Sequence, residues 1–467
     1  MAFEYNFPLF SILLVMASAL VMPLFKNYKI ARNLHIAVVA AVGVFSLALM
    51  MRFMKTGGTF TYMMGHYPAP WGNELRFGLF ESMMAALFSV VMLLAVIAGQ
   101  GRIELEVKPS RKSLYYSLLN MLLASMLALI YTNDIFTAYV FIEINTIAAC
   151  AIVLAKDSGE SLLATLRYLV MSLLGSGLFL ISVAIIYSIT GHLLFSSLQT
   201  AIVKLGGNES YRIPLMMAGV LMTFGLCVKS AVFPFHTWLA DAHSSTTTAS
   251  SSILSGLVVK SYIILLVKIY YRVLGVQTVE STGLFQVIFV LGILGMMFGS
   301  FNALKEKESK RMIAYSSVAQ IGYIFMGLGL GNVIGLSAAF FHLIAHAFTK
   351  PLLFLAESGL SDAAGHSRLN ADLTGAGYKN RIAGISYVVG AFSMVGIPLF
   401  AGFTAKWYMA GAAFQMPSKT LPALIALAIS TCLNAMYYLP VVLTIYKRNP
   451  GEAANQARQC RSRLSPM

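Results

Sequence analysis

About thirteen apolar stretches of this chain are long enough to cross a lipid bilayer. A spanning helix needs about 20 apolar residues to cross a hydrocarbon core of about 30 Å. Only 11% of the residues are charged, against about 25% in a soluble globular domain, which excludes a water-soluble fold. We therefore predict an all-α polytopic membrane protein with spans at 6–25, 33–52, 79–99, 113–132, 134–155, 162–190, 213–239, 245–271, 284–304, 312–330, 333–356, 381–415 and 421–446.

No motif for a cofactor, a metal or bond chemistry is found in the sequence. The cysteines Cys150, Cys227, Cys432 and Cys460 are far apart and form no CxxC pair, which argues against a zinc or iron–sulfur site. No Walker loop, HExxH or GxSxG occurs, and no polar stretch is long enough for a haem or flavin domain. We expect no cofactor, no metal and no catalysed bond chemistry in this chain.

The basic residues predict how the chain is oriented. Basic residues are enriched in cytoplasmic loops. If the N-terminus lies outside, most of the Lys and Arg residues fall on the inside, chiefly in 26–32, 102–112, 305–311 and 368–381 and in a basic tail, 447–467. The net charge of +15 is then a topological signal, and nucleic-acid binding is not expected. The first span has no cleavage-type site and is expected to be retained. We predict the cell (inner, cytoplasmic) membrane, with the C-terminus cytoplasmic.

Four charged residues lie near the middle of predicted spans. They are Glu143, Lys229, Lys260 and Lys406. A charge at mid-bilayer costs from about 3 to over 10 kcal/mol, so a charge retained there points to a function. Arg167 and Lys268 lie nearer the span ends, where we expect their side chains to snorkel toward the interface.

Two prolines lie close to two of these lysines. Pro234 follows Lys229 in the seventh span, and Pro398 precedes Lys406 in the twelfth. Proline removes a helix hydrogen bond, and in lipid the freed carbonyls need protein or water partners. The pattern predicts two broken helices that line hydrated half-channels, although a simple proline kink would give the same sequence.

The eleventh span carries three titratable residues at helical spacing. His342, His346 and Lys350 are four residues apart and share one face of the helix. Histidine titrates near neutral pH, so this stripe could relay protons through intervening water. A packing role for the histidines is the alternative.

Three further residues are secondary candidates. Glu81 begins the third span and could be a structural partner or a functional acid. His236 lies within the seventh-span break, beside Pro234. Asp241 lies at the predicted cytoplasmic end of that span, where it could line a channel mouth or cap a helix.

Five segments in order resemble the signatures of the antiporter-like proton-translocating membrane subunits. The segments are FPFHTWLADAH (233–243), SGLVVKSY (255–262), KRMIAYSSVAQIGYIFMG (310–327), HLIAHAFTKPLLFLAESG (342–359) and GIPLFAGFTAKWY (396–408). This family comprises the large membrane subunits of complex I, the A and D subunits of Mrp-type Na⁺/H⁺ antiporters, and membrane-bound hydrogenase subunits. The segment YPAPWGNEL (67–75) looks most like the Mrp D branch.

The resemblance implies two inverted five-helix repeats, spans four to eight and nine to thirteen, each with one broken helix. The expected division is an N-terminal three-helix segment at 1–112, repeats at 113–272 and 284–446, and the tail at 447–467. The family usually has fourteen helices, and the link between spans seven and eight usually carries prolines where this chain has SSTTTASSS.

Residue by residue, the resemblance also implies roles for the buried charges. Glu143 and Lys229 match the family's charge pair, Lys260 its central lysine and Lys406 its terminal lysine. His342, His346 and Lys350 match its relay on helix eleven. The implied function is proton translocation, with or without Na⁺ exchange, beside other membrane subunits of an Mrp-type, hydrogenase or complex I-like assembly. A stand-alone transporter of an organic solute and a non-conducting scaffold subunit are the alternatives.

Overall fold

The computed structural model describes residues 3–67, 72–206 and 208–447. Twelve helices in these ranges are long and apolar enough to cross a membrane. The remaining predicted span, 381–415, is divided into α17 (Arg381–Val395) and α18 (Ala401–Phe414). Most of the predicted tail, 447–467, and part of the segment YPAPWGNEL lie outside the described residues.

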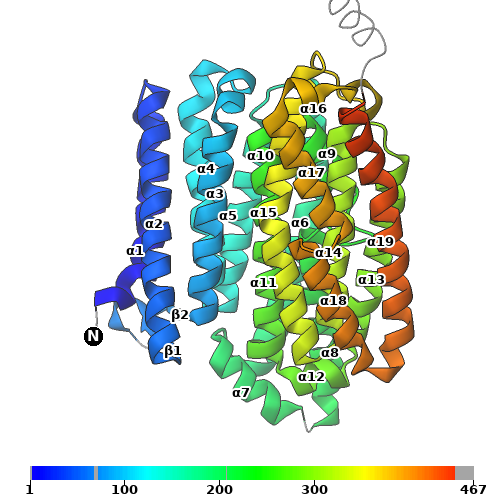
Figure 1. Cartoon of the computed structure of the whole chain (residues 1–467). Helices are drawn as coiled ribbons and strands as arrows, with labels where there is room; N and C mark the ends of the chain where they lie inside the picture. The colour runs from blue at the N-terminus through cyan, green and yellow to red at the C-terminus, as the bar shows by residue number, and fades with distance from the viewer. Residues whose placement is uncertain (1–2, 68–71, 207, 448–467) are drawn as a thin grey trace, which may run out of the picture.

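The N-terminal segment consists of three helices and a hairpin. These are α1 (Phe7–Val21), α2 (Tyr28–Thr56), β1 (Thr59–Met63), β2 (Glu74–Gly78) and α3 (Leu79–Glu106). The strands pair antiparallel, with Thr61 opposite Arg76. The helices α1 and α2 form one edge of the bundle (Figure 1).

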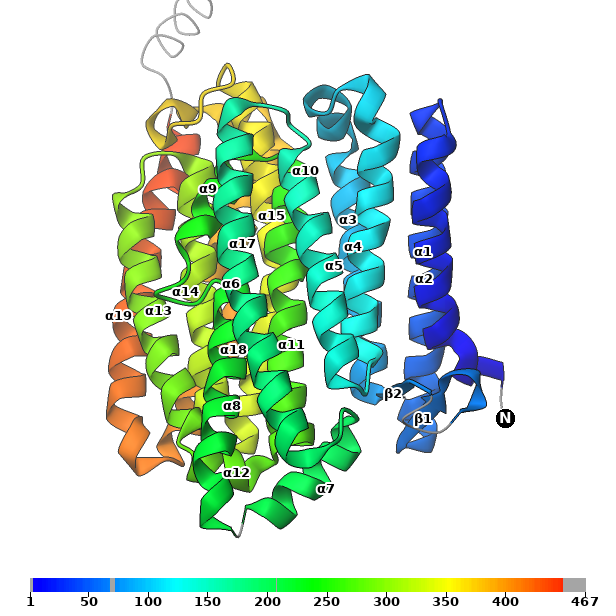
Figure 2. The same cartoon turned by 180° about the vertical axis from the view of Figure 1, so that it is seen from behind.

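The next part of the chain contains the first broken helix. Its α-helices are α4 (Lys112–Tyr131), α5 (Ile135–Leu154), α6 (Gly159–Thr190), α7 (Phe195–Leu205), α8 (Glu209–Lys229), α9 (Thr237–Ser245), α10 (Thr248–Ile253), α11 (Val259–Ile269) and α12 (Val276–Ser281). Two π-helical turns, Leu254–Val258 and Tyr270–Leu274, flank α11. Seen from behind, α6 and α8 lie on the face opposite α15, α17 and α18 (Figure 2).

The last part contains the second broken helix. In addition to α17 and α18 it has α13 (Leu284–Lys305), α14 (Ser309–Gly329), α15 (Val333–Ala363), α16 (Ala376–Lys379) and α19 (Pro417–Ile445). Glycine lets α13 and α14 pack closely, because a Cβ on Gly292 would lie 2.3 Å from the backbone nitrogen of Met326. Small residues at such contacts are typical of helix packing in membranes.

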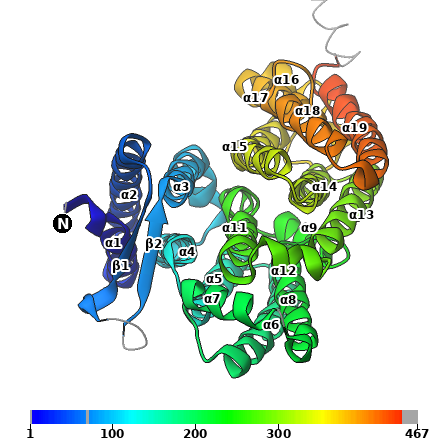
Figure 3. The same ribbon diagram turned by 90° about the horizontal axis from the view of Figure 1, so that it is seen from below.

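Two helical segments form the interior of the bundle. In the segment Thr248–Leu274, all residues of the most apolar 18-residue stretch are buried. In the corresponding stretch of α14, 94% of the residues are buried. Viewed along the bundle axis, α11 lies between α4 and α5 on one side and α14 and α15 on the other (Figure 3). We refer to α4–α12 and α13–α19 as the two halves of the chain. The two halves meet around α11, the helix that carries Lys260.

The ends of the described chain lie at opposite ends of the bundle. The first residues lie beside the β-hairpin, and α19 ends near α16 (Figure 1).

Polar side chains cap the starts of several helices. For example, Asn332 accepts a hydrogen bond of 2.7 Å from the backbone nitrogen of Gly335. Such caps satisfy backbone donors that a helix leaves free at its start.

Candidate functional site: a row of buried basic groups

The first broken helix ends at a buried lysine. The helix α8 stops at Lys229, and regular helix resumes at Thr237, so the intervening segment with Pro234 is not helical. Within it Ala231 has φ +54°, a conformation that L-residues rarely adopt. Trp238 donates from its indole nitrogen to the carbonyl of Val228 at 3.3 Å, which satisfies one carbonyl at the end of α8.

Lys229 is not in contact with Glu143. Its ammonium donates to the Oγ1 of Thr146 at 2.5 Å and lies 5.9 Å from the ring of Tyr262. Glu143 is one turn away from Thr146 on α5 and is partly exposed. Among the described residues no ion pair within 4 Å joins Glu143 to Lys229, although its charge still acts on the lysine from a greater distance. The pair implied by the family resemblance is therefore a longer-range interaction here.

Lys260 is fully buried near the start of α11, two residues after a π-helical turn. Its ammonium donates to the carbonyl oxygen of Ser255, which belongs to that turn. A π-helical turn within an α-helix is frequent at functional sites. The turn packs tightly on α15, because a Cβ on Gly256 would lie 2.8 Å from the ring of Pro351.

Two serine hydroxyls lie between Lys260 and Lys350. The hydroxyls of Ser255 and Ser317 form a hydrogen bond of 2.9 Å between the π-helical turn and α14. The Ser317 hydroxyl donates to the carbonyl of Ile313 at 3.2 Å, and Lys350 donates to the same carbonyl at 2.8 Å. Lys260 donates to the backbone carbonyl of Ser255, so the two lysine ammonium groups each bind a carbonyl, and the two serine hydroxyls lie between these carbonyls.

The stripe on α15 lies inside the bundle. His342, His346 and Lys350 are fully buried, and the two imidazoles stack with centroids 6.4 Å apart. His342 bonds through Nε2 to the Oε1 of Gln320 at 2.9 Å. Among the described residues, neither ring nitrogen of His346 has a hydrogen-bond partner. A buried imidazole without partners is costly, so a plain packing role explains His346 poorly.

Lys406 lies across the second helix break. Its side chain extends from α18, and its ammonium donates to the carbonyls of Met394 and Val395 at the end of α17, at 3.1 and 2.8 Å. These carbonyls are left without helical partners because the chain leaves the helix before Pro398. The ammonium also lies 4.7 Å from the ring of Tyr323. The Tyr323 ring is 5.5 Å from that of His342, so it lies next to both basic groups.

The secondary candidates are held in polar contacts. Glu81 is buried and pairs with Arg272 at 2.6 Å, while its other oxygen accepts from the backbone nitrogen of Gly78 at 2.9 Å. These contacts favour the structural interpretation of Glu81. His236 is buried and lies 3.4 Å from the side-chain nitrogen of Asn302.

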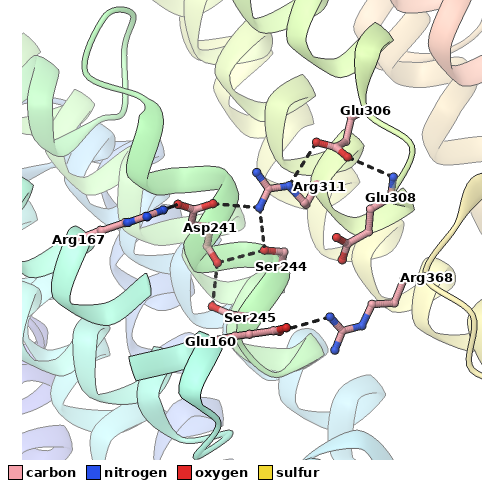
Figure 4. A network of polar contacts seen from close by, with 9 residues as sticks. All are labelled: Glu160, Arg167, Asp241, Ser244, Ser245, Glu306, Glu308, Arg311 and Arg368. Carbon is pink, nitrogen blue, oxygen red and sulfur yellow. Dashed lines mark hydrogen bonds and ion pairs between the residues drawn. The ribbon is translucent and has the colours of Figure 1, made fainter. Parts of the chain in front are cut away.

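Asp241 joins the two halves of the chain. It pairs with Arg167 of α6 at 2.5 Å and with Arg311 of α14 at 2.9 Å. Figure 4 shows this network, in which Arg311 also reaches Glu306 at 3.2 Å. The close-up also shows the pair formed by Arg368 and Glu160, at 3.4 Å. Asp241 therefore forms ion pairs with two other helices, which goes beyond the role of a simple helix cap.

The prediction that Lys268 snorkels toward the interface is wrong. Lys268 is buried and donates to the carbonyls of Ile130 and Thr132, at 2.7 and 2.6 Å, at the end of α4. The carbonyls that end α4 attract its ammonium into the protein. Lys419 binds the carbonyl of Gly329 at the end of α14 in the same way, at 2.7 Å.

Several polar residues of the site gave no clear signal in the sequence. They are Thr146, Ser255, Gln320 and Ser317, together with the aromatic residues Tyr262 and Tyr323. Hydroxyls are common in membrane helices, so only their position opposite a buried lysine distinguishes them.

No group of three or more His, Cys, Asp or Glu side chains that could hold a metal occurs in the part of the chain that the structure describes.

Comparison with known proteins identifies the family. The family described as NADH:quinone oxidoreductase/Mrp antiporter, TM, matches residues 132–433. This chain belongs to that family. The match spans all seven of the principal site residues, from Glu143 to Lys406.

Relatives come from more than one branch of the NADH:quinone oxidoreductase/Mrp antiporter family. The N subunit of the NADH-quinone oxidoreductase of Desulforudis audaxviator is 31% identical over 432 residues, which cover 91% of this chain and 83% of that protein. The D subunit of the Na⁺/H⁺ antiporter of Bacillus subtilis is 24% identical over 423 residues, which cover 91% of this chain and 84% of that protein.

Two solved structures share the fold of this chain. A chain of the membrane-bound sulfane sulfur reductase, an archaeal respiratory membrane complex, superposes with a TM-score of 0.85 at 26% identity, covering 98% of this chain and 93% of that chain. A chain of the Mrp complex from a Dietzia species superposes with a TM-score of 0.84 at 23% identity, covering 96% of this chain and 81% of that chain.

Proposed function

We propose that this chain is a proton-translocating subunit of a multisubunit membrane complex. The observation that carries the proposal is the buried row of basic groups, in which the hydrogen bond between the hydroxyls of Ser255 and Ser317 lies between Lys260 and Lys350. Burying four ammonium groups and two histidines costs several kcal/mol each. A scaffold subunit would gain nothing from that cost.

The proposed route follows the row in order. A change in the charge near Glu143 alters the cost of keeping Lys229 protonated, because their charges interact in a poorly screening medium. A proton then moves through the Lys260 region to the stripe on α15. From His342 it passes beside Tyr323 to Lys406, whose amine lies at the second helix break.

We propose that the surroundings of the chain follow the family pattern. Two inverted repeats, 113–272 and 284–446, would each supply one half-channel, with the segment 1–112 beside them. The chain would lie in the cytoplasmic membrane with its N-terminus outside, which the distribution of basic residues supports. Other membrane subunits would be its partners, because the relatives are subunits of larger assemblies.

The proposal is tested by isolating the chain with its partners. A tagged copy is pulled down from gently solubilised native membranes, and its companions are identified by mass spectrometry. We expect several membrane subunits, and proteoliposomes of the whole assembly should then move protons across the membrane. A chain that comes down alone and transports an organic solute would contradict the proposal and support a stand-alone transporter.

The same proteoliposomes show whether Na⁺ is exchanged. Two relatives are named as subunits of Na⁺/H⁺ antiporters. We therefore measure ²²Na⁺ uptake driven by an outward-directed proton gradient, in parallel with proton movement. Proton movement that depends on Na⁺ supports exchange, and proton movement without Na⁺ supports a pump driven by a partner module.

A further inference from the structure

The carboxylate of Glu357 lies on the same helix as Lys350 but has no place in the proposed proton route. It follows Lys350 by seven residues on α15, so both side chains lie on nearly the same face, about 10 Å apart along the axis. Its side chain is 5% exposed. Among the described residues no hydrogen bond or ion pair holds the carboxylate. A buried acid without a partner is expensive to keep.

Glu357 lines a polar cavity between the ends of α3 and α15 and the starts of α10 and α14. The cavity has a volume of about 180 Å³, enough for several water molecules at about 30 Å³ each. Exposed residues, His366 and Arg368, line its outer part, and buried residues, Lys310 and Glu357, line its inner part. Solvent at this end of the molecule can therefore reach the carboxylate.

The other charged groups around Glu357 are engaged elsewhere. Lys310 of α14 donates to the carbonyl of Thr246 at 2.7 Å. Glu106 of α3 accepts from the backbone nitrogen of Thr248 at 2.8 Å. Arg102 pairs with Asp362 and also donates to a backbone carbonyl. With Glu308, these groups act on Glu357 only through their charges.

His243 packs on α15 at a position between Lys350 and Glu357 in the sequence. The imidazole is fully buried and stacks on the ring of Phe354, with centroids 4.9 Å apart at 25°. Phe354 is four residues after Lys350 and three before Glu357, so His243 contacts α15 between the two. Neither ring nitrogen of His243 has a hydrogen-bond partner within the part of the chain that the structure describes. The cationic groups that act on this imidazole are Lys310, Lys350 and Lys260.

We infer that Glu357 and His243 form a proton-uptake branch that connects this cavity to Lys350. The inference rests on the proposed function. A proton from water in the cavity binds a carboxylate oxygen of Glu357. That O–H bond breaks as a water molecule takes the proton, and this water gives a proton to one imidazole nitrogen of His243. The second ring nitrogen releases its proton, through a second water molecule, to the amine of Lys350 in its deprotonated form. No oxidant or further reactant is needed, because only protons change place.

The test compares variants of Glu357 in the assembled complex. Glu357→Gln should lower the rate of proton translocation at least about tenfold while the complex still assembles. Glu357→Asp should recover part of the rate, because a carboxyl is kept. Asp362→Asn, which also removes a carboxylate from the cavity wall, is the matched control and should stay within about twofold of wild type.

His243 provides the second measurement. His243→Gln should cause a loss similar to that of Glu357→Gln, and the double variant should be no slower than either single one, because both residues serve one branch. The pH profile of Glu357→Asp should differ from that of wild type, which a purely structural role would not produce.

Two outcomes separate this inference from the proposed function. If Glu357→Gln translocates protons like wild type while Lys260→Ala does not, the branch is wrong and the proposed function stands. If Lys260→Ala also translocates, the proposed function itself fails. If Glu357→Gln does not assemble, an unchanged rate and pH profile in Glu357→Asp and an unchanged rate in His243→Gln would overturn the branch.

Discussion

Ser255 and Ser317 form a hydrogen bond of 2.9 Å across the boundary between the two halves of the chain. Ser255 lies in the π-helical turn beside Lys260, and Ser317 lies on α14 beside the carbonyl that Lys350 binds. The link between the two central lysines therefore depends on two small hydroxyl side chains. Removing either hydroxyl interrupts the link without creating a large cavity.

Ser317→Ala should slow proton translocation about tenfold without reducing assembly. The expected cause is the loss of a donor and acceptor between the lysines, since a buried hydrogen bond contributes about 1 kcal/mol or more. The rate is measured in proteoliposomes of the assembled complex. Ser317→Thr keeps the hydroxyl and is the matched control. Equal rates for the Ala and Thr variants would rule out this link as part of the route.

Two variants of Lys406 separate its structural role from its proposed proton role. Lys406→Gln can still donate to the carbonyls of Met394 and Val395 but cannot carry a proton, whereas Lys406→Leu does neither. We expect both variants to lose translocation. Only the Leu variant should lower the thermal midpoint of the purified complex, with a cost of about 1–3 kcal/mol. Retained translocation in Lys406→Gln would contradict the proposed role.

Lys268→Met should weaken the fold and leave the transport route intact. Without the ammonium, the buried carbonyls of Ile130 and Thr132 lose a charged donor, which costs about 1.5–3 kcal/mol. The thermal midpoint of the purified complex should fall. Translocation per assembled complex should match wild type, and a specific loss of rate at normal stability would show that Lys268 belongs to the route.

Glu308 should make stability depend on pH. Glu308 precedes α14, and burial raises the pKa of its carboxyl above the ordinary value of 4.5 although nearby arginines oppose this. A carboxyl with a raised folded pKa supports folding at pH values below 4.5, and this contribution is lost as pH rises through the folded pKa. Ionised Glu308 is therefore destabilising at neutral and alkaline pH.

Glu308→Gln removes that cost, because the amide stays neutral. Its thermal midpoint should exceed that of wild type at pH 8, and the difference should shrink as pH falls toward 4.5. Glu306→Gln is a useful comparison, since Glu306 is instead paired with Arg311 at 3.2 Å and should lose stability. A Glu308→Gln variant that is less stable than wild type at pH 8 would contradict the sign of this effect.

The sequence alone predicts the membrane class and the positions of the principal charges. Apolar length reports helices reliably because a lipid-exposed backbone must satisfy its own hydrogen bonds. The break beside Pro398 also follows from local chemistry, as proline removes a backbone donor. The spacing of His342, His346 and Lys350 places them on one face, and they do lie together in the interior.

Contacts between distant segments were not predictable in the same way. Asp241 binds arginines that lie 74 and 70 residues away in the chain. Lys268 near a helix end has the pattern of a snorkelling residue, yet the nearby end of α4 gives its ammonium three carbonyl oxygens inside the protein. The distance between Glu143 and Lys229 likewise depends on how α5 and α8 pack. Side-chain pairing of this kind needs the tertiary fold.

The most direct test of proton translocation through the buried row is the rate shown by the assembled complex when Lys260 is replaced with alanine. Lys204→Ala, at an exposed position on α7, is the control for loss of a lysine. The assay uses proteoliposomes with a pH-sensitive dye inside and equal amounts of assembled complex. We predict that Lys260→Ala reduces the rate to the background of empty vesicles while Lys204→Ala matches wild type. A Lys260→Ala complex that translocates protons at the wild-type rate would contradict the proposed function.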